Sequence, residues 1–154
     1  MKRTALTALI ALGQLALVGV AVAPQLSARV LGETYLMEVA PLDPIDPFRG
    51  AYVALDYPGL RRDDAQSSDH GAVYVTLVEQ GGVWIAGEWT RERPEDGPYL
   101  ACDDRSWQVR CGIESWFLPQ DDAAAAEGLL RDGAVAEVKV DSRGNAAVVD
   151  VRAP

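Results

Sequence analysis

The segment PLDPIDPFRGAYVALDY, residues 41–57, organises this chain, because it joins a stiff acidic turn to a short strand. Pro44 and Pro47 fix their own backbone φ angles and push the residues before them, Asp43 and Asp46, towards extended geometry. The two carboxylates are therefore predicted to lie on a rigid backbone. Such a backbone either serves only as a turn or presents its side chains for contact.

A predicted strand, residues 52–57, follows the turn. Gly50 precedes it and can adopt a positive φ or allow another backbone to approach closely. Side chains alternate along a strand, so one face is apolar and the other is mixed. The apolar face consists of Val53, Leu55 and Tyr57, and the mixed face consists of Tyr52, Ala54 and Asp56. The mixed face is the candidate surface.

Residues 50–57 read GAYVALDY, residues 41–49 read PLDPIDPFR, and residues 112–119 read GIESWFLP. They closely resemble three segments of the GDYXXLXY family, namely G-D-Y-x-x-L-x-Y, P-x-D-P-x-D-P-[FL]-R and G-I-E-x-[YW]-F-x-P. The resemblance covers most of the chain. One departure is Ala51, which stands where the family signature has Asp, so any chemistry of that Asp would be missing here.

The resemblance implies a bacterial, membrane-anchored protein of about this size, from a family whose biochemical role is not established. Members are often encoded beside multi-span membrane proteins that are also uncharacterised. A multi-span membrane protein is therefore the expected partner. Oligomeric state does not follow from the resemblance.

Residues 4–23 form an apolar run interrupted only by Gln14, and at about 1.5 Å per residue a helix of this length spans a bilayer core. A cleaved signal peptide is the rival interpretation, because residues 21–23, AVA, have a small-x-small pattern. However, the run is longer than the usual apolar region of about 7–15 residues, and Pro24 would follow the cleaved bond. We predict an uncleaved anchor.

Lys2 and Arg3 precede the apolar run and favour a cytoplasmic N-terminus, which places the rest of the chain in the periplasm or extracytoplasmic space. We therefore expect a single-pass protein of the bacterial inner membrane. Its predicted parts are a cytoplasmic tip and anchor at residues 1–23, a juxtamembrane segment at 24–33, and an extracytoplasmic β-rich domain at 34–154.

The chain is acidic, with 14 basic and 23 acidic residues and a net charge of −9. Removing Lys2 and Arg3 leaves 12 basic residues against the same 23 acidic ones, so the part after the apolar run carries −11. Such a field repels phosphate backbones, so nucleic acid is not an expected partner. Cationic ligands or divalent ions are compatible with it, although a simply solvated acidic surface is the expected state.

Two hairpins are predicted from turn residues and β-forming runs, at 72–79 with 83–90 and at 134–140 with 145–151. Further strands are expected at 34–40, 98–102, 106–111 and 113–118, and one soluble helix after Pro119, capped by Asp121 or Asp122. The predicted fold is mainly β with one short soluble helix (α+β). Its antiparallel sheet forms a partial barrel or a sandwich.

Cys102 and Cys111 are the only cysteines. A hairpin between them would place them opposite one another, so in an oxidising compartment we predict a structural disulfide. Two unpaired thiols or a metal pair are the alternatives. The metal interpretation is weak because His70 alone could add a nitrogen ligand.

Asp43 and Asp46 are candidates for metal binding or acid–base chemistry, which need several oxygens around one point or a carboxyl group with a raised pKa. Aspartate before proline is also a common turn former, so we expect these carboxylates to bind loop amides or Arg49. Arg49 is a candidate clamp for a ligand carboxylate. We favour an internal partner for it: Asp46, Asp43 or Glu114.

Glu114 lies in an aromatic, strand-like stretch where a buried carboxylate needs a partner. We hypothesise that it pairs with Arg49 or the Tyr52 hydroxyl, which would connect the family-like segments. Aromatic residues in strands are core residues more often than ligand platforms. The candidates for lining a groove are nevertheless Tyr52, Tyr57, Trp116 and Phe117.

Hydrolase chemistry has little support, because the single lysine after the apolar run, Lys139, has no serine in a matching setting. His70 lies near Asp64 and Asp69, but a polar loop is a poor place for preorganised catalysis. We predict no catalytic residues and no cofactor.

Three hypotheses about function follow. The first is a binding or accessory module for a membrane partner. The alternative is a metal- or small-ligand-dependent binder or enzyme that uses Asp43, Asp46 and Glu114. The third is a turn that serves only the fold.

Overall fold

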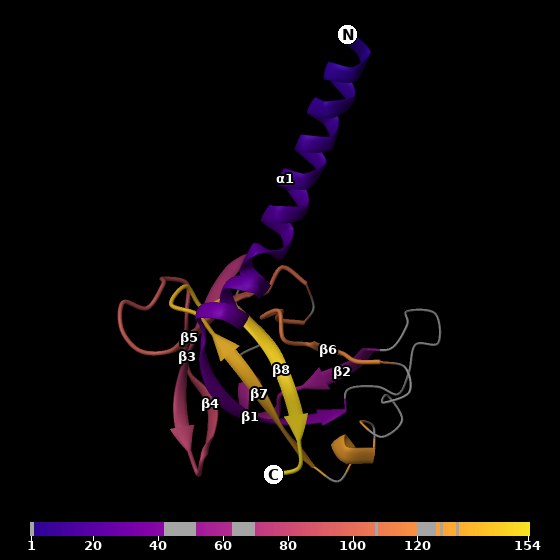
Figure 1. Cartoon of the computed structure of the whole chain (residues 1–154). Coiled ribbons are helices and arrows are strands. Elements are labelled where there is room, and N and C mark those ends of the chain that lie inside the picture. The colour runs from indigo at the N-terminus through magenta and orange to yellow at the C-terminus, as the bar shows by residue number, and fades with distance from the viewer. Residues whose placement is uncertain are drawn as a thin grey trace.

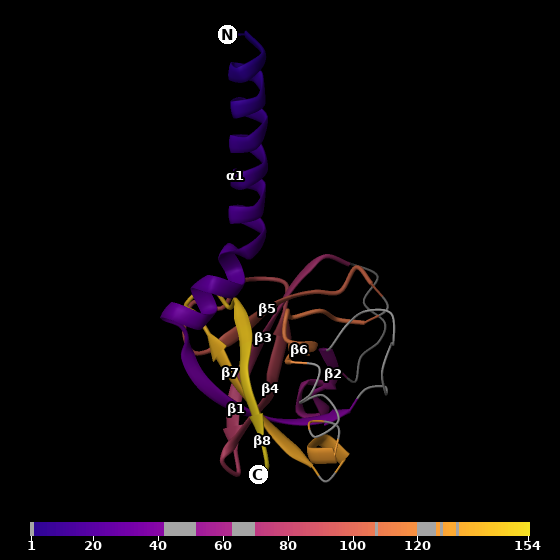
Figure 2. The same ribbon diagram turned by 45° about the vertical axis from the view of Figure 1, so that its right-hand side comes forward.

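The computed structural model describes residues 2–41, 52–62, 70–106, 108–119, 126, 128–131 and 133–154 (Figures 1 and 2). A long helix rises from one end of a β-rich domain. The labelled elements are α1 (Lys2–Leu31), β1 (Glu33–Pro41), β2 (Tyr52–Asp56), η1 (Pro58–Leu60), β3 (Ala72–Gln80), β4 (Val83–Thr90), β5 (Tyr99–Asp103), β6 (Ser115–Phe117), β7 (Ala134–Val140) and β8 (Ala146–Arg152).

In the part of the chain that the structure describes, α1 is the one helix long and apolar enough to cross a membrane. Its candidate span, Thr4–Leu31, has a mean hydropathy of 2.2. Leucines on all sides of the helix are exposed, which is typical of a helix surrounded by lipid. The helix therefore suits a membrane anchor.

The helix continues past Pro24 and changes direction before it meets the domain (Figure 2). Proline has no amide hydrogen, and its ring clashes with the carbonyl four residues earlier, so a bend is expected at this point. Residues 25–31 remain helical, and Gly32 leads directly into β1. The juxtamembrane segment is thus a short helix that lies against the domain.

The larger sheet has five strands in the order β6-β2-β1-β7-β8, and each neighbouring pair is antiparallel. The long β1 strand pairs with β7 along residues 33–39 and with β2 at Ala40 and Pro41. The predicted hairpin at the end of the chain is confirmed as β7 and β8.

The smaller sheet has the order β4-β3-β5, again antiparallel. The β3–β4 hairpin is confirmed, and both of its turn residues, Gly81 and Gly82, have positive φ angles of 66° and 89°. Trp84 of this hairpin packs edge-on against Tyr35 of β1, with ring centroids 4.9 Å apart. The mainly β, antiparallel fold is therefore built from two sheets, without a closed barrel.

The core draws side chains from both sheets, and the predicted apolar face of β2 is buried in it. Ala126 and Leu130 also join the core, from the helical residues 126 and 128–131. The largest side chains that are almost completely buried are Met37, Leu55, Leu100, Ile113 and Leu130.

The predicted strand at 106–111 is wrong. The chain instead returns to β5 through one isolated bridge between Asp103 and Arg110. The Ser106 hydroxyl bonds the backbone of Gln108, and such local bonds compete with a strand ladder. The next predicted strand is also shorter than expected, since β6 covers only residues 115–117.

Candidate functional site

Four candidates from the acidic turn, Asp43, Asp46, Arg49 and Gly50, lie outside the described residues, as does Ala51. Tyr52 begins β2. The remaining candidates, which the structure does place, are Tyr57, Glu114, Cys102 and Cys111.

Strands β2 and β6 bring the two family-like segments side by side. Val53 lies opposite Trp116 in the antiparallel register, and the Leu55 amide donates to the Glu114 carbonyl oxygen at 2.9 Å. The expected connection between the segments is therefore made by backbone pairing. Arg49 lies beyond the described ranges, so its pairing with Glu114 stays a hypothesis.

The Glu114 carboxylate caps the turn at Cys111 and Gly112. It accepts the Cys111 amide, and its two oxygens lie 3.0 and 3.1 Å from the Gly112 amide nitrogen. Gly112 has a φ of 83°, in the left-handed region that favours glycine. These bonds give the Glu114 side chain a structural role beside the disulfide.

Tyr57 belongs to the core. Burial raises the pKa of its phenol, and the negative charge of Glu114 raises that pKa further. The hydroxyl donates to the Ile113 carbonyl oxygen at 3.0 Å. Among the other aromatic candidates, Trp116 packs against the core whereas Phe117 is exposed.

Cys102 and Cys111 form the predicted disulfide, with their Cα atoms 4.1 Å apart. Between them, Asp103 and Arg110 exchange two backbone hydrogen bonds of 2.8 Å each. The disulfide therefore closes a short loop on the edge of β5.

The buried carboxylate of Asp104 is the centre of a partly buried charge cluster that the sequence did not reveal. Its carboxylate receives two bonds from Arg91, at 2.6 and 3.0 Å, and one from Arg62 at 3.2 Å. The Gly71 amide donates to it at 2.7 Å, and His70 Nδ1 lies 3.1 Å from the Asp104 backbone carbonyl oxygen. The cluster therefore links Arg62, His70 and Gly71 to the residue that follows β5.

The Arg91 hydrogen bonds, opposed by burial and helped by the Gly71 amide, lower the pKa of Asp104 from 3.8 to about 2. Between these values the unfolded chain binds a proton that the folded chain does not, so stability should fall as the pH drops. We expect the free energy of unfolding to be constant near neutral pH and to decrease from about pH 4 towards pH 2. Urea unfolding followed by tryptophan fluorescence across this range checks it. Constant stability down to pH 2 would contradict the assignment.

Three side chains of α1 fasten the helix to the domain. Gln25 Nε2 donates to the Gly112 carbonyl oxygen at 2.9 Å, and Arg29 Nη2 donates to the Val148 carbonyl oxygen at 3.0 Å. Ser27 Oγ lies 2.5 Å from the Asp141 carboxylate. These bonds reach three separate parts of the domain, so they fix both the position and the rotation of the helix end.

The carboxylate of Asp141 organises the β7–β8 turn. It accepts bonds from Ser27, from the backbone amides of Arg143 and Asn145, and from the Asn145 side chain, at 2.5–3.0 Å. Burial opposes ionisation, but the bonds from Ser27, Asn145 and the backbone outweigh it and lower the pKa of Asp141. The turn and the helix end therefore share one ionised, fully engaged carboxylate.

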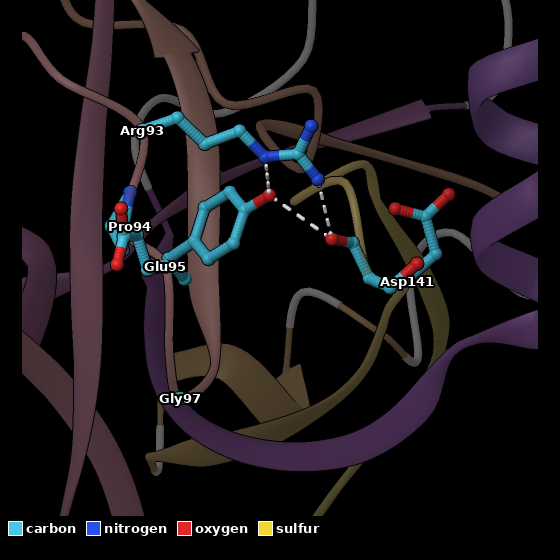
Figure 3. Close-up of a pocket in the computed structure, with 7 residues that line it drawn as sticks. Arg93, Pro94, Glu95, Gly97 and Asp141 are labelled. Atoms are coloured by element: carbon cyan, nitrogen blue, oxygen red, sulfur yellow. Dashed lines mark hydrogen bonds between the residues drawn. The ribbon is translucent and has the colours of Figure 1, made fainter.

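A pocket of about 510 Å³ opens beside this turn (Figure 3). Arg93 Nε donates to the Tyr99 hydroxyl at 2.5 Å, and Arg93 Nη2 donates to the Ser142 carbonyl oxygen at 2.8 Å. The Tyr99 hydroxyl donates to the same carbonyl at 3.0 Å. The guanidinium is thereby held in place on the pocket wall. The lining residues are Arg93, Pro94, Glu95, Gly97, Tyr99, Asp141 and Ser142.

Within the described ranges, no group of three or more His, Cys, Asp or Glu residues is placed to hold a metal ion. Asp43 and Asp46 lie outside these ranges.

In the part of the chain that the structure describes, the apolar helix, the two antiparallel sheets and the disulfide define a small, mainly β protein with one candidate membrane span. A family model described as GDYXXLXY protein matches residues 14–151, which is most of the chain. The chain belongs to the GDYXXLXY family, as the motifs at 41–57 and 112–119 indicated. Comparisons with curated proteins and with solved structures found no match.

Proposed function

We propose that this protein is a single-pass protein of the bacterial inner membrane, whose extracytoplasmic domain is an accessory module for a multi-span membrane partner. Lys2 and Arg3 support this orientation because basic residues favour the cytoplasmic side. The Cys102–Cys111 disulfide supports an oxidising compartment such as the periplasm.

The observation that carries the proposal is the junction between α1 and the domain. Gln25, Ser27 and Arg29 each bind a different part of the domain, and Ala28 is completely buried there. Retention at the membrane alone needs only a flexible linker. A junction that fixes orientation is useful when the domain must meet a second protein in the same membrane.

The acidic turn is the proposed contact surface. β2, which follows it, is fixed by its pairing with β6 and by the burial of Val53 and Leu55. The acidic turn is therefore joined at its C-terminal end to a fixed strand, which supports the presentation of Asp43 and Arg49 for contact.

A photo-crosslinking amino acid at position 43 or 49 of the full-length protein, in intact membranes, should capture a membrane protein. Gln80, exposed at the tip of the β3–β4 hairpin, provides the matched control position. The expected result is one recurrent membrane-protein product from positions 43 and 49 that is absent from position 80. Repeated recovery of the chain alone from all three positions would count against the proposal.

A further inference from the structure

Beyond residues 4–23, the span predicted from the sequence, α1 continues with exposed apolar side chains, and the candidate span of the structure extends to Leu31. Leu26, Val30 and Leu31 are 58%, 68% and 75% exposed, whereas Ala28 is fully buried against the domain. Leu26 and Val30 are four residues apart and share one face of the helix. An apolar stripe next to a spanning helix is typical of a segment that lies in the membrane interface.

The same part of α1 indicates where the pocket lies along the bilayer normal, provided that the helix spans the bilayer as proposed above. Ser27 lies four residues beyond Ala23, where the span predicted from the sequence ends. Because the helix bends after Pro24, Ser27 is at most about 6 Å further from the bilayer centre than Ala23. The headgroup layer extends about 5–7 Å beyond the hydrocarbon core on each side. Ser27 is bonded to Asp141, which lines the pocket, so the pocket lies at headgroup depth.

The arrangement of the loops agrees with this depth. Figure 1 shows the β7–β8 turn and the β4–β5 connection at the end of the domain from which α1 rises. Arg93 and Glu95 belong to the β4–β5 connection, and Ser142 belongs to the β7–β8 turn. The pocket is thus formed between two connections on the membrane side of the domain.

The pocket lining holds one cation, Arg93, and two carboxylates, Glu95 and Asp141. The bonds from Arg93 to Tyr99 and to the Ser142 carbonyl use two of the five guanidinium N–H groups and fix its plane. Asp141 is already engaged by Ser27 and its own turn, whereas Glu95 is exposed on the rim. A guanidinium suits a phosphate, and a carboxylate suits a primary ammonium.

We propose that this pocket binds the headgroup of a zwitterionic phospholipid, with the phosphate at Arg93 and a primary ammonium at Glu95. An ethanolamine headgroup supplies both groups. A choline headgroup has no N–H donor for Glu95, and a glycerol headgroup has no cation. The volume of about 510 Å³ falls in the range of small-molecule sites.

The test uses the full-length protein in nanodiscs that contain equal amounts of phosphatidylethanolamine, phosphatidylcholine and phosphatidylglycerol, with retained lipids measured by native mass spectrometry. Phosphatidylethanolamine should be retained about tenfold over phosphatidylcholine, the factor that one charge-assisted hydrogen bond supplies. Glu95→Gln should abolish this preference, and Arg93→Gln should reduce retention of all three lipids. Glu92→Gln and Arg143→Gln, exposed neighbours outside the pocket, should behave as the wild type.

Because Arg93 also bonds Tyr99 and Ser142, its variant is compared only after its melting temperature has been measured. Glu95→Gln removes no bond of the described fold and keeps the test decisive. Equal retention of the three lipids by the wild type would overturn the inference and leave the anchoring proposal intact. Extraction of the wild type from membranes by alkaline carbonate would instead overturn the anchoring. Equally tight binding of soluble phosphoethanolamine would reject a lipid ligand.

Discussion

Replacement of Asp104 with asparagine should lower the free energy of unfolding by about 3 kcal/mol. The amide has the shape of the carboxylate but lacks the charge that Arg62 and Arg91 share, and its NH₂ group faces donors. The carboxylate is only 8% exposed, so water compensates little. The two arginines are partly exposed, which keeps the expected loss at the lower end of the range for a broken buried ion pair.

Equilibrium urea unfolding of the full-length protein in detergent micelles, followed by tryptophan fluorescence, measures this loss. Asp103→Asn is the matched control, because the Asp103 carboxylate neighbours Asp104 in the chain but pairs with the exposed Arg105. Surface ion pairs of this kind contribute little to the free energy of unfolding. The variant at position 104 should also lose the part of the acid sensitivity that Asp104 supplies, while the part that Asp141 supplies remains. Equal free energies of unfolding for the two variants would show that the Asp104 ion pairs stabilise the fold no more than the exposed Asp103 pair does.

Replacement of Gly144 with alanine should be at least as damaging, at about 3 kcal/mol or more. Gly144 has a φ of 80°, and its carbonyl oxygen accepts the Ala101 amide at 2.9 Å, which joins the two sheets. A Cβ atom there would lie 2.6 Å from the Tyr99 ring and 2.8 Å from the Ala101 nitrogen. Backbone cannot move aside as a flexible side chain does, so the link between the sheets should open.

The control is Gly128→Ala, since Gly128 is helical and a Cβ atom there would meet nothing within 4 Å. This change should stabilise the protein by about 0.5–1 kcal/mol, because alanine is the better helix former. The two alanine variants are therefore expected to shift the melting temperature in opposite directions. A neutral Gly144→Ala would show that the turn can relax away from β5.

Local patterns predicted much of this fold. The hairpins at β3–β4 and β7–β8 carry their own turn residues, and the alternation in β2 identified its buried face. The cysteine pair was predictable because a return of the chain from Asp103 to Arg110 places Cys102 near Cys111, and a single bridge between Asp103 and Arg110 is sufficient for this. The hypothesis that Glu114 pairs with Arg49 or the Tyr52 hydroxyl stays untested, although β2 and β6 do bring the two segments together through their backbones.

The charge cluster and the pocket were not predictable in the same way. Asp104 sits in a charged run, where nothing distinguishes a buried carboxylate from the exposed one at Asp103. Its partners come from positions 62 and 91, and only the tertiary fold brings them together. The strand predicted at 106–111 failed because Ser106 and Glu114 satisfy backbone groups that a ladder would otherwise have used.

If α1 spans a bilayer as proposed, its attachment to the domain has a geometric consequence in the plane of that bilayer. The helix cannot spin about its axis without carrying the whole domain, because Gln25, Ser27 and Arg29 bind three parts of it. Successive residues of an α-helix point about 100° apart. Every lipid-facing row of side chains on α1 therefore keeps a fixed direction relative to β2 and the pocket. A neighbouring helix that packs along one row would thereby select the side of the domain that it meets, without touching the domain itself.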